Sequence, residues 1–223
     1  MFEGEYLNRK KWNGKGYNIN GKVDYEIKEG KGKGKQYYDD GKIKFGGKYL
    51  NGKRNGQGKE IDYNGKLEFE GEYLNGKRNG KGSIFSSEGT LRYEGEFLNG
   101  VRNGKGKDYH RNDSLRYEGE YLNGERNGKG KEYDLVGNLK FEGEYLNGKK
   151  NGKGKEYDWN GNLKFEGEYL NGKRNGKGKE YDYGVLVFEG EFLNGDRNGK
   201  GKEYDDGDLI FEGEYLNGNR IIN

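Results

Sequence analysis

Apolar and polar residues alternate along short segments of this chain, and the same alternation returns many times. In LKFEGEYLN, residues 163–171, Phe165 and Tyr169 fall on one face, whereas Glu166 and Glu168 fall on the other. A period of two residues is typical of a strand with one buried face. A second, more polar segment, GKGKEYD, follows after an Asn-Gly pair, and such pairs favour hairpin turns. Two strands and two turns in each copy predict a continuous antiparallel meander.

The copies follow one another at a nearly constant spacing. The spacing is 24 residues five times and then 23 residues twice, which is the range of a repeat architecture. The aromatic residues that open successive repeats are Phe45, Phe69, Tyr93, Tyr117, Phe141, Phe165, Phe188 and Phe211.

The change of spacing predicts how the strands pair. Five residues separate Tyr157 from Leu163, and a three-residue loop with a glycine bulge would pair these two residues. Only four residues separate Tyr181 from Leu186, and a two-residue loop would pair them; the last repeat has the same shorter loop. The aromatic–aliphatic pair across the strands is thereby preserved. The NGKRNG loop is harder to interpret, since a bulge there would decide which face Lys177 occupies.

The expected fold class is all-β, an elongated single-layer antiparallel β-meander or solenoid of stacked 23–24-residue β-hairpin repeats. We expect divergent repeats over residues 1–44, one nearly full and one truncated, and a regular array over residues 45–223. Strands about 4.8 Å apart would advance each hairpin by about 10 Å. The predicted core comprises Phe69, Tyr73, Tyr93, Phe97, Tyr117, Tyr121, Phe141, Tyr145, Phe165, Tyr169, Phe188, Phe192, Phe211 and Tyr215.

Composition supports order and restricts the function. Only 28% of residues are hydrophobic and 45 are glycine, which is common in disordered chains, but proline is absent and regularly spaced aromatic residues make up 14%. The net charge of +3 argues against direct nucleic-acid binding. There is no cysteine, and no stretch approaches the roughly 18 apolar residues of a membrane span. We expect a cytoplasmic protein, or a fragment whose targeting signal lies elsewhere.

The repeated segments YEGEFLNGVRNGKG and FEGEYLNGKRNGKG resemble the MORN (membrane occupation and recognition nexus) repeat. The continuation GKGKEYDxNGxLxFEGEY is similar to the bacterial-type variant found in YwqK-family antitoxins. The resemblance covers the chain from residue 45 and, more weakly, residues 1–44. It implies an elongated hairpin array that serves as a scaffold or recognition surface, with acidic phospholipids, partner proteins or a second copy as partners. The chain departs from the variant at Gly176–Gly178, where many such repeats carry an aromatic residue.

No arrangement of side chains predicts catalysis. His110 is the single histidine and lies at an expected turn, so no zinc site can be built around it. Glutamates such as Glu142 and Glu166 recur from repeat to repeat, about 10 Å apart, which exceeds the roughly 5 Å separation of a retaining glycosidase pair. The GKGKE segment lacks the spacing of a phosphate-binding loop. We therefore expect a protein that is not an enzyme, with no cofactor and no metal site.

The repeated charges predict rows along the array. Lys81, Lys105, Lys129, Lys153, Lys177 and Lys200 would form one row, beside the basic loop residues Arg78, Arg102, Arg126, Lys150, Arg174 and Arg197. A parallel acidic row would contain Glu72, Glu96, Glu120, Glu144, Glu168 and Glu191. Two interpretations stand: mutual neutralisation across strands, or a charge-striped surface that fits an elongated partner.

Two stretches, 83–90 and 108–114, break the repeat. Asp113 stands where other repeats have glycine, and Ser86 and Ser87 replace the usual residues before the turn. Sequence drift explains these changes, or they form a partner-specific patch. The candidate partner-binding residues are Arg78, Lys81, Ser86, Ser87, Arg102, Lys105, His110, Arg111, Asp113, Arg126 and Lys129.

Three functional hypotheses follow. The first is a scaffold that binds a protein partner, including antitoxin-like inhibition of a toxin or nuclease. The second is a membrane-surface adaptor for anionic lipid, although the expected loops lack dense basic clusters. The third is a structural element that forms a homo-oligomer through its edge strands.

Overall fold

The computed structural model describes residues 1–222, and within them all twenty strands are antiparallel and no helix occurs. The predicted all-β hairpin repeat is therefore confirmed. The chain divides into two compact units, an N-terminal unit of Met1–Asp113 and a C-terminal unit that begins at Ser114. The expected boundary between residues 44 and 45 lies inside the N-terminal unit.

The N-terminal unit contains the first ten strands. Their bounds are β1 Phe2–Leu7, β2 Lys10–Tyr17, β3 Val23–Lys28, β4 Lys31–Tyr37, β5 Ile43–Leu50, β6 Lys53–Ile61, β7 Leu67–Leu74, β8 Lys77–Phe85, β9 Leu91–Leu98 and β10 Val101–Tyr109. The C-terminal unit contains the other ten. Their bounds are β11 Leu115–Leu122, β12 Glu125–Tyr133, β13 Leu139–Leu146, β14 Lys149–Tyr157, β15 Leu163–Leu170, β16 Lys173–Asp182, β17 Val185–Leu193, β18 Asp196–Asp205, β19 Asp208–Leu216 and β20 Asn219–Ile221.

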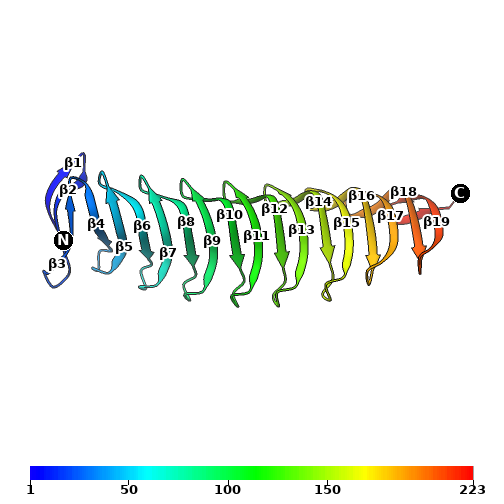
Figure 1. The fold of residues 1–223 in the computed structure, drawn as a ribbon, viewed down its shortest axis with the longest axis horizontal. Coiled ribbons are helices and arrows are strands. Elements are labelled where there is room, and N and C mark those ends of the chain that lie inside the picture. Colours follow the sequence, from blue (N-terminus) through cyan, green and yellow to red (C-terminus); the bar gives the residue numbers. More distant parts are fainter. Residues whose placement is uncertain (223) are drawn as a thin grey trace. The chain divides into compact units, whose positions relative to one another are not determined.

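Within each unit every strand pairs with the next strand in the chain, as Figure 1 shows. Asn171 and Gly172 join β15 to β16 and have φ angles of 52° and 90°, so the two-residue turn has positive φ at both positions, as a type I′ hairpin needs. The Gly172 N–H also donates to the Lys150 carbonyl of the preceding hairpin over 2.8 Å. Equivalent bonds recur along both units, so each turn is tied to the turn before it.

The opposite ends of the hairpins confirm the register that the loop lengths predict. Tyr157 pairs with Leu163 across a longer loop in which Gly161 has a φ of 85°. Tyr181 pairs with Leu186 across the turn of Tyr183 and Gly184, and Tyr204 pairs with Leu209 in the same way. The one-residue difference in spacing is thus absorbed entirely in the loop.

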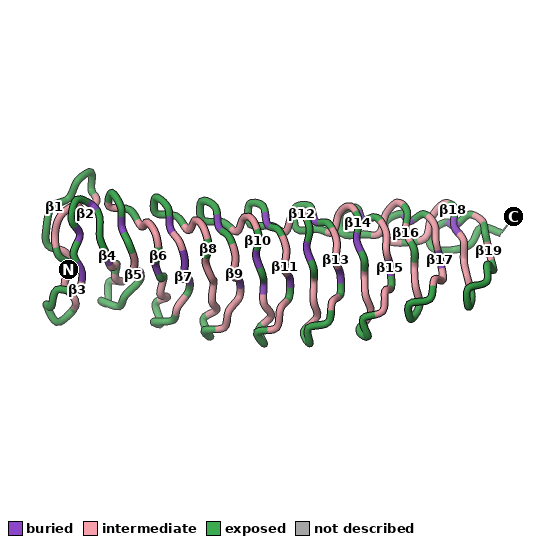
Figure 2. The backbone as a smooth tube through the Cα atoms, in the orientation of Figure 1, coloured by how far each residue is buried: buried purple, intermediate pink, exposed green. Residues whose placement is uncertain are grey.

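From Phe45 onward in the N-terminal unit, and along the C-terminal unit, the core is a column of aromatic rings on one face of the sheet. The Phe165 ring lies 5.5 Å from Tyr169 of its own strand and 5.2 Å from Phe192 of the next repeat, with edge-to-face geometry in both pairs. Figure 2 shows the buried positions recurring at matching places in successive hairpins. Of the predicted core residues, Phe211 is only partly buried, and the others are buried.

Paired glycines make room for this column. Gly167 of β15 faces Gly178 of β16, and the Phe165 ring lies across both. A Cβ added at Gly178 would lie 2.5 Å from the Phe165 ring and 3.2 Å from the Phe192 ring. The glycines therefore accommodate chiefly the ring of their own repeat, and the neighbouring ring contacts only the second glycine.

The second strand of each regular hairpin contains a bulge of three residues. In β16, Gly178 pairs with Gly167 and Arg174 pairs with Tyr169, so three residues of β16 oppose the single residue Glu168. Gly176 within the bulge has a φ of 85°, and the Glu168 side chain lies against it. The bulge leaves Arg174 on the face that carries the aromatic rings.

Candidate functional site

A row of basic side chains covers the aromatic rings on the core face. Arg126, Lys150 and Arg174 lie 4.1, 4.1 and 4.2 Å from the centroids of the Tyr117, Phe141 and Phe165 rings, respectively. These residues belong to strands β12, β14 and β16, so the prediction that the repeated basic residues lie in loops was wrong. The bulge is the reason, because it extends the second strand to include them.

Carboxylates complete this row as a ladder of ion pairs. Arg174 donates to Glu180 of its own hairpin and to Glu156 of the preceding one, over 2.7 Å in both cases. Arg197 repeats the pattern with Glu203 and Glu180. Burial raises the pKa of Glu156, but Arg174 and Lys150 lower it by more, so the net pKa is below its usual value. The basic and acidic side chains that cover the core face therefore form ion pairs with one another.

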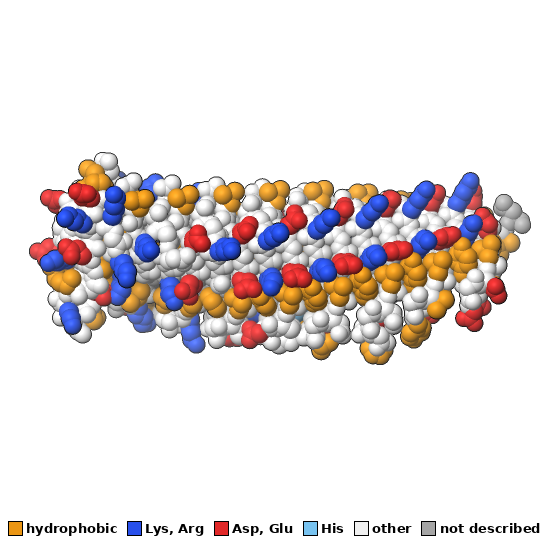
Figure 3. All heavy atoms as spheres, in the orientation of Figure 1, with side chains coloured by type: hydrophobic (Ala, Val, Ile, Leu, Met, Phe, Trp, Pro, Cys, Tyr) orange, Lys and Arg blue, Asp and Glu red, His pale blue; other side chains and the backbone are white. Residues whose placement is uncertain are grey.

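The opposite face carries the predicted lysine and glutamate rows. Lys153 faces Glu168 and Lys155 faces Glu166, and Figure 3 shows alternating basic and acidic side chains along the C-terminal unit. The Lys155–Glu166 pair is separated by 3.6 Å and is nearly half exposed, so it contributes only about 0–1 kcal/mol. Lys177 and Lys179 occupy this same face, opposite Glu191 and Glu189.

Within the described residues, three tyrosine hydroxyls on the core face lack the hydrogen bond that tyrosines on the charged face make. On the charged face, Tyr157 donates to Glu142 over 2.8 Å. On the core face, the Tyr73, Tyr145 and Tyr169 hydroxyls are buried and bond to no group among residues 1–222. Phenylalanine occupies the equivalent core position in other repeats, at Phe97 and Phe192, so the core does not need the hydroxyl there.

We expect Tyr169→Phe to leave stability at pH 7 unchanged or to raise it by up to about 1 kcal/mol, since it removes a desolvated hydroxyl without a partner. Tyr157→Phe should instead lower stability by about 1 kcal/mol, since it removes a hydrogen bond to a carboxylate. Urea unfolding followed by circular dichroism measures both. A larger loss in the Tyr169 variant than in the Tyr157 variant would contradict the assignment.

The loops opposite the Asn-Gly turns end in exposed apolar side chains in part of the C-terminal unit. Leu135 and Val136, Trp159, and Tyr183 occupy three successive loops and are 62, 81, 77 and 76% exposed. Figure 3 shows apolar side chains at loop tips of this unit. The sequence placed these residues in loops, but their exposure as a set was missed because apolar residues were assigned to the core.

Hydrogen bonds between polar residues stabilise the conformation of these loops, and the apolar side chains at the tips take no part in them. The Asp158 carboxylate accepts the N–H groups of Asn160 and Asn162 over 2.9 and 2.8 Å, and Gly161 supplies the positive φ. The Asn162 side chain also donates to Asp158, and this hydrogen bond lowers the pKa of the carboxyl group most. The Trp159 side chain therefore makes none of these hydrogen bonds, while the Trp159 carbonyl accepts one from the Asn138 side chain of the preceding loop.

The two stretches that break the repeat preserve its loop geometry. Ser86 takes the place of Asp158, and its Oγ accepts the N–H groups of Glu88 and Thr90 over 3.2 and 3.3 Å. Asp113 adopts a φ of 62° where other loops have glycine. These substitutions are thus compatible with the repeat, and the partner-specific patch remains a prediction.

The other candidate residues of the N-terminal unit occupy several environments. Arg78 and Arg102 lie in strands, on the rings of Phe69 and Tyr93. Lys81 pairs with Glu96 on the charged face, as Lys129 pairs with Glu144 in the C-terminal unit. Lys105 lies in β10, where its N–H donates to Glu96, and Ser87, His110 and Arg111 lie in loops.

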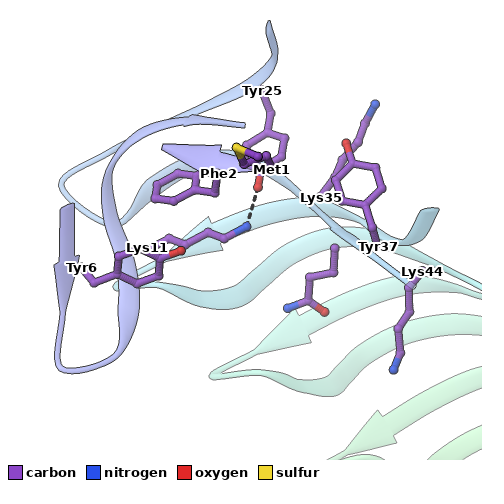
Figure 4. A pocket seen from close by; sticks show the side chains of 9 residues that line it. Met1, Phe2, Tyr6, Lys11, Tyr25, Lys35, Tyr37 and Lys44 are labelled. Carbon is purple, nitrogen blue, oxygen red and sulfur yellow. Dashed lines mark hydrogen bonds between the residues drawn. The ribbon is translucent and has the colours of Figure 1, made fainter. Parts of the chain in front are cut away.

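A cleft of about 450 Å³ lies in the N-terminal unit, at its first hairpins. In Figure 4, Lys11 extends past Phe2 toward the Tyr25 hydroxyl, and Lys35, Tyr37 and Lys44 lie across the opening. Lys11 donates a hydrogen bond to Tyr25, whose pKa burial raises to about 12. The sequence showed a truncated repeat here but gave no sign of a cleft.

The part of the chain that the structure describes contains neither a metal-binding cluster nor a membrane-spanning helix. No group of three or more histidine, aspartate or glutamate side chains is arranged to hold a metal ion among residues 1–222. Over the same residues, no helix has the length and apolarity needed to cross a membrane.

Comparison with known proteins agrees with the repeat geometry. The family model of the MORN repeat matches seven segments, and no curated protein matches the chain. The matched segments are residues 47–66, 69–90, 93–107, 117–134, 141–162, 165–183 and 188–209. MORN repeats are commonly binding or scaffold modules, and their proteins are generally non-catalytic. Because these segments cover more than half of the residues and coincide with the observed hairpins, the chain belongs to the MORN repeat family.

Proposed function

We propose that this chain is a non-enzymatic scaffold that binds a protein partner through the loop tips of its C-terminal unit. The observation that supports this proposal is the run of exposed apolar side chains in three successive loops, Leu135 and Val136, Trp159, and Tyr183. Single exposed apolar residues are ordinary, but contiguous ones are typical of interaction surfaces. At the equivalent loop position Asp39, Ser87, Arg111 and Asp206 are polar, whereas Ile19 and Tyr63 of the N-terminal unit are exposed apolar residues. Because a polar loop separates Ile19 from Tyr63, only the C-terminal unit carries apolar tips on three successive loops among residues 1–222.

The charges beside the tips favour a protein over an anionic membrane. Asp134, Asp158 and Asp182 stand directly before the apolar residues of the three loops. The loop hydrogen bonds hold the pKa of Asp134 and Asp158 below the usual value, so both stay ionised at neutral pH. A row of carboxylates repels anionic headgroups, whereas it suits a protein surface with apolar pockets and basic residues around them. In its finer form the proposal is antitoxin-like: the partner is a toxin or nuclease that the complex inhibits.

Replacing the aromatic tips tests the proposal. Once the partner is purified by affinity to the wild-type chain, Trp159→Ser combined with Tyr183→Ser should weaken the complex by about 30-fold or more, as for loss of buried aromatic anchors worth about 2 kcal/mol. Isothermal titration calorimetry measures the affinity. The matched control is Asp39→Ser combined with Asp206→Ser, which changes the same loop position in other repeats and should leave the affinity within about threefold.

Two results would overturn the proposal. One is equal affinity of the wild type and the tip variant for the partner. The other is flotation with phosphatidylserine vesicles at low salt that disappears in the tip variant, which would assign the same side chains to a membrane. Light scattering of the wild type across concentrations tests the self-assembly hypothesis on the same sample, since self-association makes the mass rise with concentration.

A further inference from the structure

The first hairpin departs from the ion-pair ladder of the other repeats. In regular hairpins the basic residue meets an acid six residues later, as in Arg54–Glu60 and Arg174–Glu180, at 2.6 and 2.7 Å. Lys11 occupies the basic position of the β1–β2 hairpin, since Lys11 faces Tyr6 as Arg54 faces Tyr49. The acidic position is Gly16, which faces Phe2 as Glu60 faces Phe45. The cation of the ladder is therefore present without its carboxylate.

The space at Gly16 is filled by an aromatic ring. A Cβ on Gly16 would lie 2.1 Å from the Tyr25 ring, so no side chain fits at this position. The Lys11 ammonium lies 4.8 Å from the Phe2 centroid and 5.1 Å from the Tyr25 centroid. Among residues 1–222 no carboxylate is within ion-pair distance of Lys11. The group is half-buried, and this burial lowers its pKa.

The truncated hairpin opens a space beside this cation. β3 and β4 pair only through Ile27–Gly32 and Lys28–Lys31, so the two strands separate beyond Ile27. The resulting cleft has aromatic walls from Phe2, Tyr6 and Tyr25 on the side of Lys11 (Figure 4). On the other side Lys35 is already neutralised by Asp24, at 2.6 Å. Lys44 also lines the cleft, but it is exposed and lies 5.3 Å from the centroid of the Tyr38 ring. Lys11 is thus the half-buried cation of the cleft that lacks a carboxylate partner.

We propose that this cleft binds an acidic peptide side chain, whose carboxylate pairs with Lys11 as Glu180 pairs with Arg174. The aromatic walls would receive an apolar side chain beside the acid in the peptide, and partial desolvation would strengthen the ion pair. One half-buried ammonium suits one carboxylate, whereas phosphate groups are usually held by several cations or by backbone N–H groups. The site is separate from the loop tips and lies in the other unit.

A peptide titration tests the site. The probe is acetyl-Gly-Leu-Glu-Phe-Gly-amide, titrated by calorimetry into the full chain, with the glutamine counterpart and inorganic phosphate as comparisons. Lys11→Met keeps most of the aliphatic stem and should weaken binding of the glutamate peptide at least 10-fold, and the glutamine peptide should bind the wild type at least 10-fold more weakly. Lys164→Met, an exposed lysine of the C-terminal unit, is the matched control and should change nothing.

A second measurement keeps the test independent of variant folding. In the wild type, the NMR resonance of the Lys11 ammonium should report a pKa that rises when the glutamate peptide is added. The proposal is overturned by equal binding of the glutamate and glutamine peptides, by full binding to a folded Lys11→Met variant, by phosphate binding as tightly as the peptide, or by an unchanged Lys11 pKa. The loop-tip variant with serine at positions 159 and 183 should bind the peptide normally, so failure of one proposal is distinguishable from failure of the other.

Discussion

Replacing Gly167 with alanine should lower the free energy of unfolding of the C-terminal unit by about 2–4 kcal/mol, the upper part of the range for overpacking a core. A Cβ at this position would lie 2.6 Å from the Gly178 Cα and 2.7 Å from both the Lys177 carbonyl oxygen and the Phe165 ring. Two of these neighbours are backbone atoms held in the β15–β16 ladder. Relief therefore requires the strands to separate, and the hydrogen bonds that pair them would be lost.

Gly161→Asp is the matched control for this substitution. Gly161 has a φ of 85°, and nothing lies within 4 Å of the position where its Cβ would be. Asp113 already occupies the equivalent loop position in another repeat, with a φ of 62°. Aspartate tolerates this conformation, so the control should lose no more than about 1 kcal/mol. Urea unfolding of both variants at pH 7 gives the comparison, and similar losses in the two would contradict the steric argument.

The loss of stability should also be confined to the hairpins near Gly167. Repeat arrays are stabilised by each hairpin and its contacts with the neighbouring hairpins. Amide exchange in the Gly167 variant should therefore accelerate most in β15 and β16, less in the adjacent β14 and β17, and little in β11. Uniform acceleration across the C-terminal unit would indicate one cooperative transition instead.

The hairpin repeat was accessible from the sequence because its signals are local. The Asn171–Gly172 pair predicts a turn with two positive φ angles. The alternation of Phe165, Gly167 and Tyr169 predicts which face of the strand is buried. The change from five to four intervening residues also gave the correct cross-strand pairs. These features depend on neighbouring residues only, and a repeated sequence supplies the same test several times.

The placement of the basic residues was not accessible in the same way. Arg174 lies next to a turn in a polar segment, and polarity alone favours a loop. The three-residue bulge that returns Arg174 to the core face depends on how β15 and β16 pair, and on Glu168 lying against Gly176. Pairing of this kind cannot be derived from the alternation of one strand, because the bulge interrupts it.

The candidate binding surfaces also depend on the folded arrangement, which the sequence pattern does not give. The two stretches that depart from the repeat, around Ser86 and Asp113, attracted the prediction of a binding patch, yet the structure shows that they reproduce the loop geometry. Trp159 and Tyr183 lie in loops that have the usual turn residues of the repeat. The sequence pattern therefore does not indicate that they form a binding surface. The proposal that they bind a partner rests on their exposure in successive loops, which only the folded arrangement reveals. The Lys11 cleft likewise depends on how far β3 and β4 separate.

Raising the pH above 10 should unfold the protein over a narrow range. Burial, followed by the hydrogen bond to Glu118, raises the pKa of Tyr133 to about 12, and Tyr157 has the same shift with Glu142. Burial also raises the pKa of Tyr93 to about 12. Tyrosines of the unfolded chain ionise near pH 10. Folded tyrosines thus hold their protons more tightly, so their contribution to stability is complete below pH 10 and is lost as the pH rises toward 12.

Tyr93→Phe separates this effect from the loss of lysine charge in the same pH range. Phenylalanine occupies the equivalent position at Phe69, Phe141 and Phe165, so the variant keeps the packing of the ring. It loses the hydrogen bond from the Tyr93 hydroxyl to the Glu96 carbonyl, which is worth about 1 kcal/mol at pH 8. Urea unfolding at pH 8, 10, 11 and 12 should show a smaller decline for the variant than for the wild type. Because both proteins contain the same lysines, the difference between their two stability curves measures the effect of ionising Tyr93. Parallel curves would show that the lysines alone control alkaline unfolding.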